Sequence, residues 1–225
     1  LCSPKRVIAG GPANPVAIVD ETADLAKAAK DISDGASFDN NIMCISEKCI
    51  VAVESIVPAF VKQLEENGVY YIDNETEMLQ LTKTVLNHDM KMVRKMEGKS
   101  AMDILEEAGI HPNRPVRLVV VRTFAKHPLV LEERLMPVVP LVAVADFEEA
   151  LETALFTEQG YRHTAMVHSQ CIDRLSKAAK IMNTTVFIKN GSSLAGIGLN
   201  GEEMESFTIA NVTGEGITTA RDFAC

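Results

Sequence analysis

Short apolar runs, rich in Val and Ile and with few polar positions, recur along the chain. Such uninterrupted runs are typical of strands that are covered on both faces of a sheet. The expected strands are residues 15–19, 50–53, 117–121, 137–145, 164–167 and 185–188.

Between these runs, apolar residues recur with the spacing of a helix. Leu25, Ala28 and Ile32 illustrate this period, and Gly68 and Asp146 stand where a C-cap and an N-cap are expected. The expected helices are residues 20–33, 54–67, 75–86, 100–108, 147–156 and 169–182.

Strand and helix therefore alternate through most of the chain, which predicts an α/β fold with a largely parallel sheet covered by helices on both faces. The charged stretch 87–99 has no clear period and is left unassigned. A length of 225 residues suits one large domain or two small ones.

The formal net charge is -9, with 22 Lys and Arg against 31 Asp and Glu. A negative field disfavours nucleic acid and anionic membrane surfaces, so we expect neither as a partner. No apolar run approaches the length of a transmembrane helix, and the first residues do not have the pattern of a signal peptide.

The cysteines are odd in number and widely spaced, and no Cys-x-x-Cys pair occurs. This pattern predicts free thiols in a reducing cytoplasm rather than a zinc site or a redox dithiol, and we expect no metal. Most free cysteines are buried as apolar filler. The five cysteines are Cys2, Cys44, Cys49, Cys171 and Cys225.

Cys44 is the candidate for chemistry, because the turn-favouring residues Asp39, Asn40 and Asn41 come shortly before it. Such a turn can direct backbone N–H groups at an oxyanion, and a thiol with a lowered pKa would be a nucleophile. The plain alternative is a loop that precedes a buried cysteine. Cys49 begins an expected strand and is assigned to the core.

Two further segments are candidates for ligand contacts. Gly10 and the glycine after it precede Asn14 and Pro15, and a glycine pair permits close approach of backbone to a ligand. Glu133 stands in a segment that runs into the strand at 137–145. Taken alone, both segments are ordinary turns. His163 and His168 flank an expected strand and are assigned packing or capping roles.

Together and in this order, these segments resemble the aldehyde dehydrogenase superfamily. More narrowly, they resemble the CoA-acylating acetaldehyde and propionaldehyde dehydrogenases of ethanolamine and propanediol utilisation. The resemblance covers essentially the whole chain. It is carried by Gly-Gly before Asn-Pro, Phe-Asp-Asn-Asn-x-x-Cys, Glu-Glu-x-x-x-Pro-Val-x-Pro, residues 162–169 and residues 208–216.

The resemblance implies that Cys44 attacks an aldehyde to give a thiohemiacetal, that hydride leaves for NAD or NADP, and that the resulting thioester is transferred to coenzyme A. It implies that Glu133 holds the nicotinamide ribose, with Gly10 as a second cofactor contact. Leu135 stands where the family often has an aromatic residue. Apolar residues at Ile42, Met43 and Ile45 suggest a pocket for a short aliphatic aldehyde.

Ile8 bears on the choice between coenzyme A and water. Hydrolytic relatives have a glutamate general base at the position that Ile8 occupies, and an isoleucine cannot activate water. The resemblance therefore favours acyl transfer to a thiol. The alternative is that Ile8 merely begins a core strand.

The resemblance also sets expectations for the whole protein. Residues 1–225 are expected to form the catalytic domain, with most of an N-terminal NAD-binding domain and a final oligomerisation strand absent, so that the chain alone would be inactive. The full-length enzyme would be a homo-oligomer in the cytoplasm, with a bacterial microcompartment as a narrower location. Two other functions stay open: a hydrolytic or semialdehyde dehydrogenase, and a non-catalytic scaffold domain with this fold.

Overall fold

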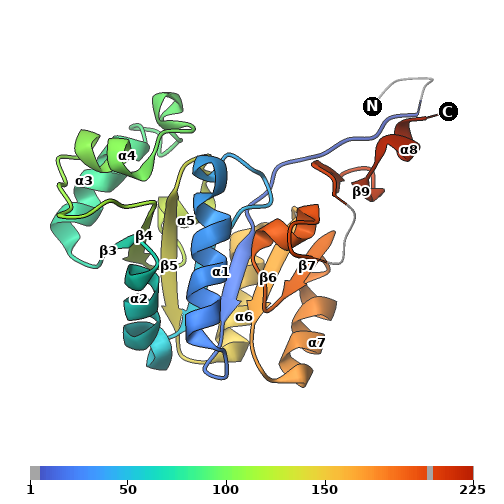
Figure 1. The fold of residues 1–225 in the computed structure, drawn as a ribbon, viewed down its shortest axis with the longest axis horizontal. Coiled ribbons are helices and arrows are strands. Elements are labelled where there is room, and N and C mark those ends of the chain that lie inside the picture. Colours follow the sequence, from blue (N-terminus) through green and yellow to red (C-terminus); the bar gives the residue numbers. More distant parts are fainter. Residues whose placement is uncertain (1–5, 202–204, 225) are drawn as a thin grey trace.

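A computed structural model describes residues 6–201 and 205–224. In this part of the chain, a seven-stranded sheet has the order β3-β4-β5-β2-β1-β6-β7, and every neighbouring pair is parallel (Figure 1). The strands are β1 (Val16–Val19), β2 (Cys49–Val53), β3 (Val69–Ile72), β4 (Leu118–Thr123), β5 (Val138–Val144), β6 (Thr164–His168) and β7 (Val186–Lys189).

Helices cover both faces of this sheet, which confirms the predicted α/β architecture. The α-helices are α1 (Leu25–Ser37), α2 (Val57–Glu66), α3 (Glu75–Val85), α4 (Ala101–Glu107), α5 (Pro128–Leu131), α6 (Phe147–Glu158), α7 (Ile172–Met182) and α8 (Ala220–Phe223). The 3-10 turns are η1 (Phe38–Asn41), η2 (Glu54–Ile56), η3 (Arg94–Met96) and η4 (Ser193–Ile197). No helix within the described residues is long and apolar enough to cross a membrane.

The core has one layer on each face of the sheet. On one face, Ile32 of α1 and Phe60 of α2 pack against Ile50 of β2. On the other face, Phe147 of α6 and Leu175 of α7 belong to a second buried cluster. Burial of this apolar surface is the dominant contribution to stability, at about 25 cal/mol per Å² removed from water.

A third cluster joins α3 and α4 to the β3 edge of the sheet, where Leu81 and Ile104 are buried with Val119. The strand β3 was not predicted from the sequence. This strand has only four residues, and its two central side chains, Tyr70 and Tyr71, are only partly buried, so it lacks a continuous Val and Ile run.

Two helices begin later than the sequence predicts. α1 begins at Leu25, where Asp24 caps it by accepting a hydrogen bond from the N–H of Lys27, and α7 begins at Ile172. The polar residues before each helix, Asp20 and Ser169, are instead engaged in a network that joins the two connections.

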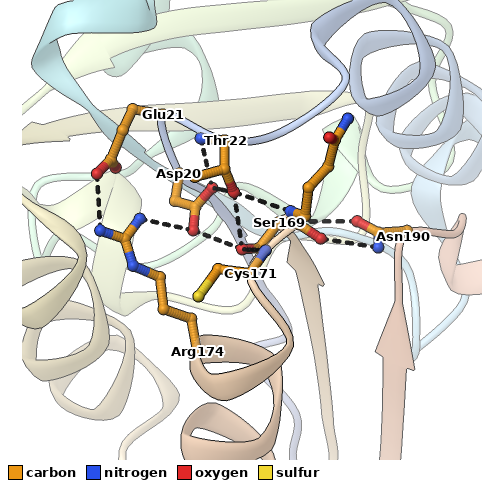
Figure 2. Close-up of polar contacts among 8 residues, drawn as sticks. Asp20, Glu21, Thr22, Ser169, Cys171, Arg174 and Asn190 are labelled. Carbon is orange, nitrogen blue, oxygen red and sulfur yellow. Dashed lines mark hydrogen bonds and ion pairs between the residues drawn. The ribbon is translucent and has the colours of Figure 1, made fainter.

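Figure 2 shows this network at the carboxyl ends of β1 and β6. The carboxylate of Asp20 is fully buried and accepts hydrogen bonds from Thr22, Ser169 and Arg174. Asn190, just after β7, accepts from the N–H of Ser169 and donates to its carbonyl. Side chains of the chain itself therefore satisfy the Asp20 carboxylate at this end of the strands, whereas the buried Nε2 of His168, the last residue of β6, has no hydrogen-bond partner among the described residues.

A small arm lies apart from the main sheet. It contains the antiparallel pair β8 (Thr208–Ala210) and β9 (Gly216–Thr218), and residues 6–11 run beside it (Figure 1). The N–H of Ala9 donates to Thr213 Oγ1 at 3.0 Å, and the N–H of Gly11 donates to Asn211 Oδ1 at 2.8 Å. The segment that contains Gly10 is thereby fixed to the arm.

Candidate functional site

Cys44 lies in the loop between α1 and β2, at the amino end of β2. Asp39, Asn40 and Asn41 precede it with φ of 47°, 53° and 62°. This left-handed region is unfavourable for most L-residues, and Asn and Asp tolerate it best. The polar run therefore forms a sharp turn, as the sequence predicts, and leads the chain into Cys44.

Asn41 holds this turn together. Its side-chain Nδ2 donates to the carbonyl of Ala36 at 2.7 Å and to the carbonyl of Glu47 at 3.1 Å, which joins the end of α1 to the approach to β2. Both oxygens of Asn41, on the backbone and on the side chain, accept hydrogen bonds from Lys48 Nζ. The residue is 1% exposed, and these bonds satisfy its buried polar atoms.

The segment before β5 approaches the same end of the sheet. The guanidinium of Arg134 is fully buried and donates to the carbonyl oxygens of Lys48, Glu132 and Val138. Glu133, the next residue toward the N-terminus, is half-buried. Arg134 thus fixes the backbone that carries Glu133 against the backbone beside the Cys44 loop.

The ionisation of Cys44 depends on its burial and on the charges of Lys48 and Glu133. Burial raises the pKa of the Cys44 thiol, the charge of Lys48 lowers it, and the charge of Glu133 raises it. The backbone N–H groups of Cys44 and Ile45 have a smaller lowering effect on this pKa. Burial has the largest effect, however, and the net shift is upward rather than the lowering expected of an activated thiol.

The pKa of the Glu133 carboxyl is also set by opposing effects. Burial raises the pKa of its carboxyl, while Lys48 and a hydrogen bond from the N–H of Ala13 lower it, with a net upward shift. That hydrogen bond connects Glu133 to the segment that follows Gly10. Gly10 itself packs on the arm, because a Cβ added there would lie 3.0 Å from the carbonyl oxygen of Ile209.

Two buried polar residues near the site, Glu47 and Lys48, were not singled out from the sequence, and a third, His163, was assigned only a packing or capping role. Glu47 and Lys48 are next to each other and buried, and burial moves their pKa values in opposite directions, each to about 7. His163, at the amino end of β6, is 2% exposed, and its pKa falls to about 4 through burial and then through the charge of Lys48. The signal in the sequence that could have indicated Glu47 and Lys48 was an adjacent Glu-Lys pair shortly after the Asn-Asn turn.

Glu47 fixes the site from a third side. Its carboxylate accepts from the N–H of Ser193 at 2.9 Å and from the hydroxyl of Ser193 at 2.8 Å. A Cβ added at Gly35 of α1 would overlap this carboxylate. Glu47 therefore ties η4 and α1 to the loop that carries Cys44.

Other predicted roles are resolved by burial. Cys49 is fully buried, and burial raises its pKa to about 12, which agrees with its assignment to the core. Ile45 is 1% exposed in the main core cluster, so its expected place in a substrate pocket is wrong; Ile42, at 45%, is the exposed neighbour.

Ile8 does not begin a strand and lines a small cleft with Phe223 of α8. Cys2 and Cys225 lie outside the described residues.

Two features lie away from Cys44. Among the described residues, no group of His, Cys, Asp or Glu side chains is arranged to hold a metal ion. A hollow of about 690 Å³ lies beside β3 and is lined by Lys62, Tyr70 and Arg114 among others. It contains no nucleophilic cysteine, and we do not assign the chemistry to it.

The model of the aldehyde dehydrogenase family matches residues 3–199 of this chain. The CoA-propanoylating propanal dehydrogenase of Salmonella typhimurium is 46% identical over 224 residues, which are 99% of this chain and 48% of that protein. The acetylating acetaldehyde dehydrogenase EutE of the same organism is 42% identical over 223 residues, 97% of this chain and 48% of that protein. The chain spans about half the length of the curated relatives it matches.

Solved structures of similar proteins belong to the same group of enzymes as these sequence relatives. A propionaldehyde dehydrogenase from Rhodopseudomonas palustris, with bound CoA and an acylated cysteine, matches with a TM-score of 0.95 and 41% identity over 99% of this chain and 51% of that one. A propionaldehyde dehydrogenase from the Clostridium phytofermentans fucose utilisation bacterial microcompartment matches with a TM-score of 0.93 and 39% identity over 98% of this chain and 50% of that one. These matches confirm the resemblance seen in the sequence: the chain belongs to the aldehyde dehydrogenase family.

Proposed function

We propose that residues 1–225 form the cysteine-bearing catalytic part of an NAD(P)-dependent, CoA-acylating aldehyde dehydrogenase, which converts a short aliphatic aldehyde and coenzyme A to an acyl-CoA. The observation that carries this proposal is the meeting of a partly buried thiol, Cys44, with the charges of Lys48 and Glu133 at one end of the sheet. The relatives named above, which are CoA-acylating enzymes, support the same chemistry.

Cys44 is the proposed nucleophile. Its sulfur bonds to the aldehyde carbon, and the carbonyl electron pair moves to oxygen. The N–H groups of Cys44 and Ile45 lower the pKa of this thiol and so favour negative charge in this region. A nicotinamide cofactor, when bound, would supply the hydride acceptor for that carbon, so that a thioester would remain on Cys44.

Coenzyme A then takes the acyl group. Its thiol sulfur bonds to the thioester carbon, the bond to Cys44 Sγ breaks, and the Cys44 thiolate is regenerated. The proton of the attacking thiol needs an acceptor, and His163 is our candidate. Its imidazole is neutral at physiological pH and can accept a proton, but burial and the charge of Lys48, which lower its pKa to about 4, make it a weaker base than a free imidazole.

Glu133 is the proposed ligand of the nicotinamide ribose. A ribose diol is a pair of hydroxyl donors, and a half-buried carboxylate can accept from both. Within the described residues, Glu133 takes part in no ion pair closer than 4.0 Å, so its oxygens keep the capacity to accept. Gly10 stays proposed as a backbone contact to the cofactor, although its packing on Ile209 already accounts for the lack of a side chain.

Acyl transfer is favoured over hydrolysis by Ile8. The hydrocarbon side chain cannot accept a proton from water, and its neighbours in the cleft include Arg6 and Phe223. The thioester on Cys44 should therefore persist in buffer and discharge when coenzyme A is added. Rapid loss of the acyl group in buffer alone would favour a hydrolytic dehydrogenase.

A homo-oligomer and a microcompartment location are also proposed. β7 is an edge strand, and a hollow of about 310 Å³ beside it is lined by Val186, Ile188 and Ile217 among others, which suits a further strand or chain. The relative from a fucose utilisation microcompartment supports the location. A single-copy mass by light scattering would count against the oligomer, and exclusion from purified compartments would count against the location.

Thioester exchange tests the central proposal without aldehyde or nicotinamide. The full-length enzyme that contains residues 1–225 is incubated with propionyl-CoA, and acylation is mapped to each cysteine of this chain by mass spectrometry. We expect a propionyl group on Cys44, removal of that group by free coenzyme A, and no acylation in Cys44→Ala. Cys171→Ala is the matched control and should be acylated normally. Equal acylation of Cys44 and Cys171 would contradict an assigned nucleophile.

A further inference from the structure

Lys48 is an ammonium group enclosed by the protein at the edge of the Cys44 loop. The residue is 1% exposed, and its Nζ donates to both oxygens of Asn41, at 2.7 Å for the backbone oxygen. A buried lysine costs free energy unless the surroundings compensate its charge. Its position therefore needs an explanation beyond packing.

The hydrogen bonds give the first part of that explanation. Asn41 is one of three successive residues with positive φ, a conformation that is unfavourable for most residues with a side chain. The two bonds from Lys48, with the two that Asn41 donates, hold this turn closed. Cys44 follows the turn by three residues, so the position of its sulfur depends on Lys48.

The surrounding charges give the second part. Lys48 has the largest lowering effect on the pKa of Cys44, and it opposes the effect of burial. Two other acidic groups and two basic groups also face Lys48, so its charge acts in a mixed field. The groups that face it are Cys44, Glu47, Glu133, Arg134 and His163.

We propose that the Lys48 ammonium both holds the Cys44 loop through Asn41 and stabilises negative charge on the Cys44 sulfur. The role deepens the proposed function and rests on it, since Cys44 is its nucleophile. Lys48 is a positioning residue in this scheme, because it acts on the reacting atom through the loop and through its charge.

The charge of Lys48 changes in the physiological range. Burial lowers its pKa to about 7, against the opposing effects of Glu133, Cys44 and Glu47. Below this pH the ammonium is charged and favours the Cys44 thiolate; above it the amine is neutral and this effect is lost. Any advantage that Lys48 gives to Cys44 should therefore be largest below about pH 7 and decline toward pH 9.

The other groups behave differently over this window. His163, with a pKa near 4, is already neutral, and Arg134, with a pKa near 10, stays charged. The pKa of Glu133 is also raised, so Glu133→Gln is included as a background. Glu47 is the main competitor, because its pKa is also about 7, so the measurement is repeated in a Glu47→Gln background.

The experiment measures the rate of iodoacetamide labelling of Cys44 against pH, mapped by mass spectrometry, in the unmutated chain and in Lys48→Gln. Glutamine can still donate to Asn41 but carries no charge. We expect Cys44 to label about three- to tenfold faster in the unmutated chain below pH 7, with a ratio that approaches one near pH 9, in every background. Lys62→Gln, at an exposed position of α2, is the matched control and should leave the ratio at one.

A ratio that does not change with pH, or that equals one throughout, would overturn the charge role. If Lys48→Gln does not fold, the reciprocal effect is measured on the unmutated chain. Carboxymethylation of Cys44 with iodoacetate adds a negative charge, and carbamidomethylation with iodoacetamide adds none. The pKa of Lys48, read from its Cε resonance by NMR, should be higher in the carboxymethylated protein, and equal values would overturn the proposal.

These measurements need no aldehyde, cofactor or coenzyme A. Failure of thioester exchange would contradict the proposed function and leave the coupling between Lys48 and Cys44 measurable. A pH-independent labelling ratio with normal thioester exchange would contradict only the role of Lys48.

Discussion

The Ser169 hydroxyl donates a 2.6 Å hydrogen bond to the carboxylate of Asp20, a side chain with no exposed surface. Together with Thr22 and Arg174, this bond joins the carboxyl ends of β1 and β6 (Figure 2). In many parallel sheets the carboxyl ends of the strands bind the ligand. Here Cys44, Glu133 and His163 all precede their strands, so the candidate site lies at the amino ends.

Asp20→Asn should destabilise the fold by about 1–3 kcal/mol, because a buried charged hydrogen-bond network loses its acceptor charge. Burial raises the pKa of Asp20, but the hydrogen bonds from Ser169, Thr22 and Arg174 outweigh it and hold the pKa below its usual range. A lowered folded pKa gives stability that is present above the unfolded value of about 3.9 and is lost as pH falls through the folded value.

Urea denaturation at neutral pH and below pH 4 measures this effect. The difference between the unmutated chain and Asp20→Asn should shrink at the acidic pH. Asp73→Asn, at an exposed position, is the control and should change stability little. A difference that stays constant with pH would contradict the assigned charge.

Asn41→Ala should lower both stability and the reactivity of Cys44. Alanine at a φ of 62° costs about 1–2 kcal/mol, and the four hydrogen bonds of Asn41 would be reduced to one on the backbone oxygen. Asn41→Gly keeps the conformation but loses the amide, so it should lose less stability than Asn41→Ala. Thermal unfolding and iodoacetamide labelling measure the two effects.

Asn183→Ala separates backbone strain from the site. Asn183 is exposed, ends α7, and also has a left-handed backbone, with φ of 46°. Its replacement should lower stability and leave the labelling of Cys44 unchanged. A comparable loss of Cys44 labelling in this variant would show that the effect at Asn41 is general destabilisation.

The architecture could be predicted from the sequence because strands covered on both faces require uninterrupted apolar side chains. The run that became β5, for example, is buried at six of its seven positions. β3 escaped prediction because Tyr70 and Tyr71 lie at an edge of the sheet and remain partly exposed. The pattern of apolar residues along the sequence indicates which strands are buried. A strand at the edge of the sheet is only partly buried, so its pattern is weaker.

The site divides in the same way. The turn before Cys44 was predictable, because Asn and Asp are the residues that tolerate positive φ. The roles of Glu47 and Lys48 were not, because charged side chains next to a strand are usually solvated. Their burial depends on Ser193 and Asn41, and only the folded chain brings Ser193 to Glu47.

Glu47→Gln should change how stability depends on pH. Burial raises the pKa of Glu47 to about 7, above its usual value, so the folded state binds a proton that the unfolded state releases. Stability is therefore lost as pH rises from about 4.5 through 7. Glutamine cannot ionise and removes this part of the dependence.

Chemical denaturation at about pH 5.5 and pH 8 tests this sign. Glu47→Gln should be more stable relative to the unmutated chain at the higher pH than at the lower pH. Glu152→Gln, at an exposed position of α6, is the control. A larger benefit at the lower pH would contradict the raised pKa.

His163→Asn should slow exchange of the acyl group between Cys44 and coenzyme A by about a hundredfold, the usual scale for loss of a general base. Asparagine can keep the contact that His163 Nδ1 makes with Thr164 Oγ1 at 2.8 Å, but it cannot accept the proton. The measurement follows labelled coenzyme A into propionyl-CoA. An acyl donor with an acidic leaving thiol needs no proton transfer to leave, so it should acylate Cys44 at nearly the normal rate in this variant. The control is His168→Asn, at the other end of β6, which should leave exchange unchanged because that imidazole lies at the end of the strand away from Cys44. Equal slowing of His163→Asn with both acyl donors would instead assign His163 a structural role.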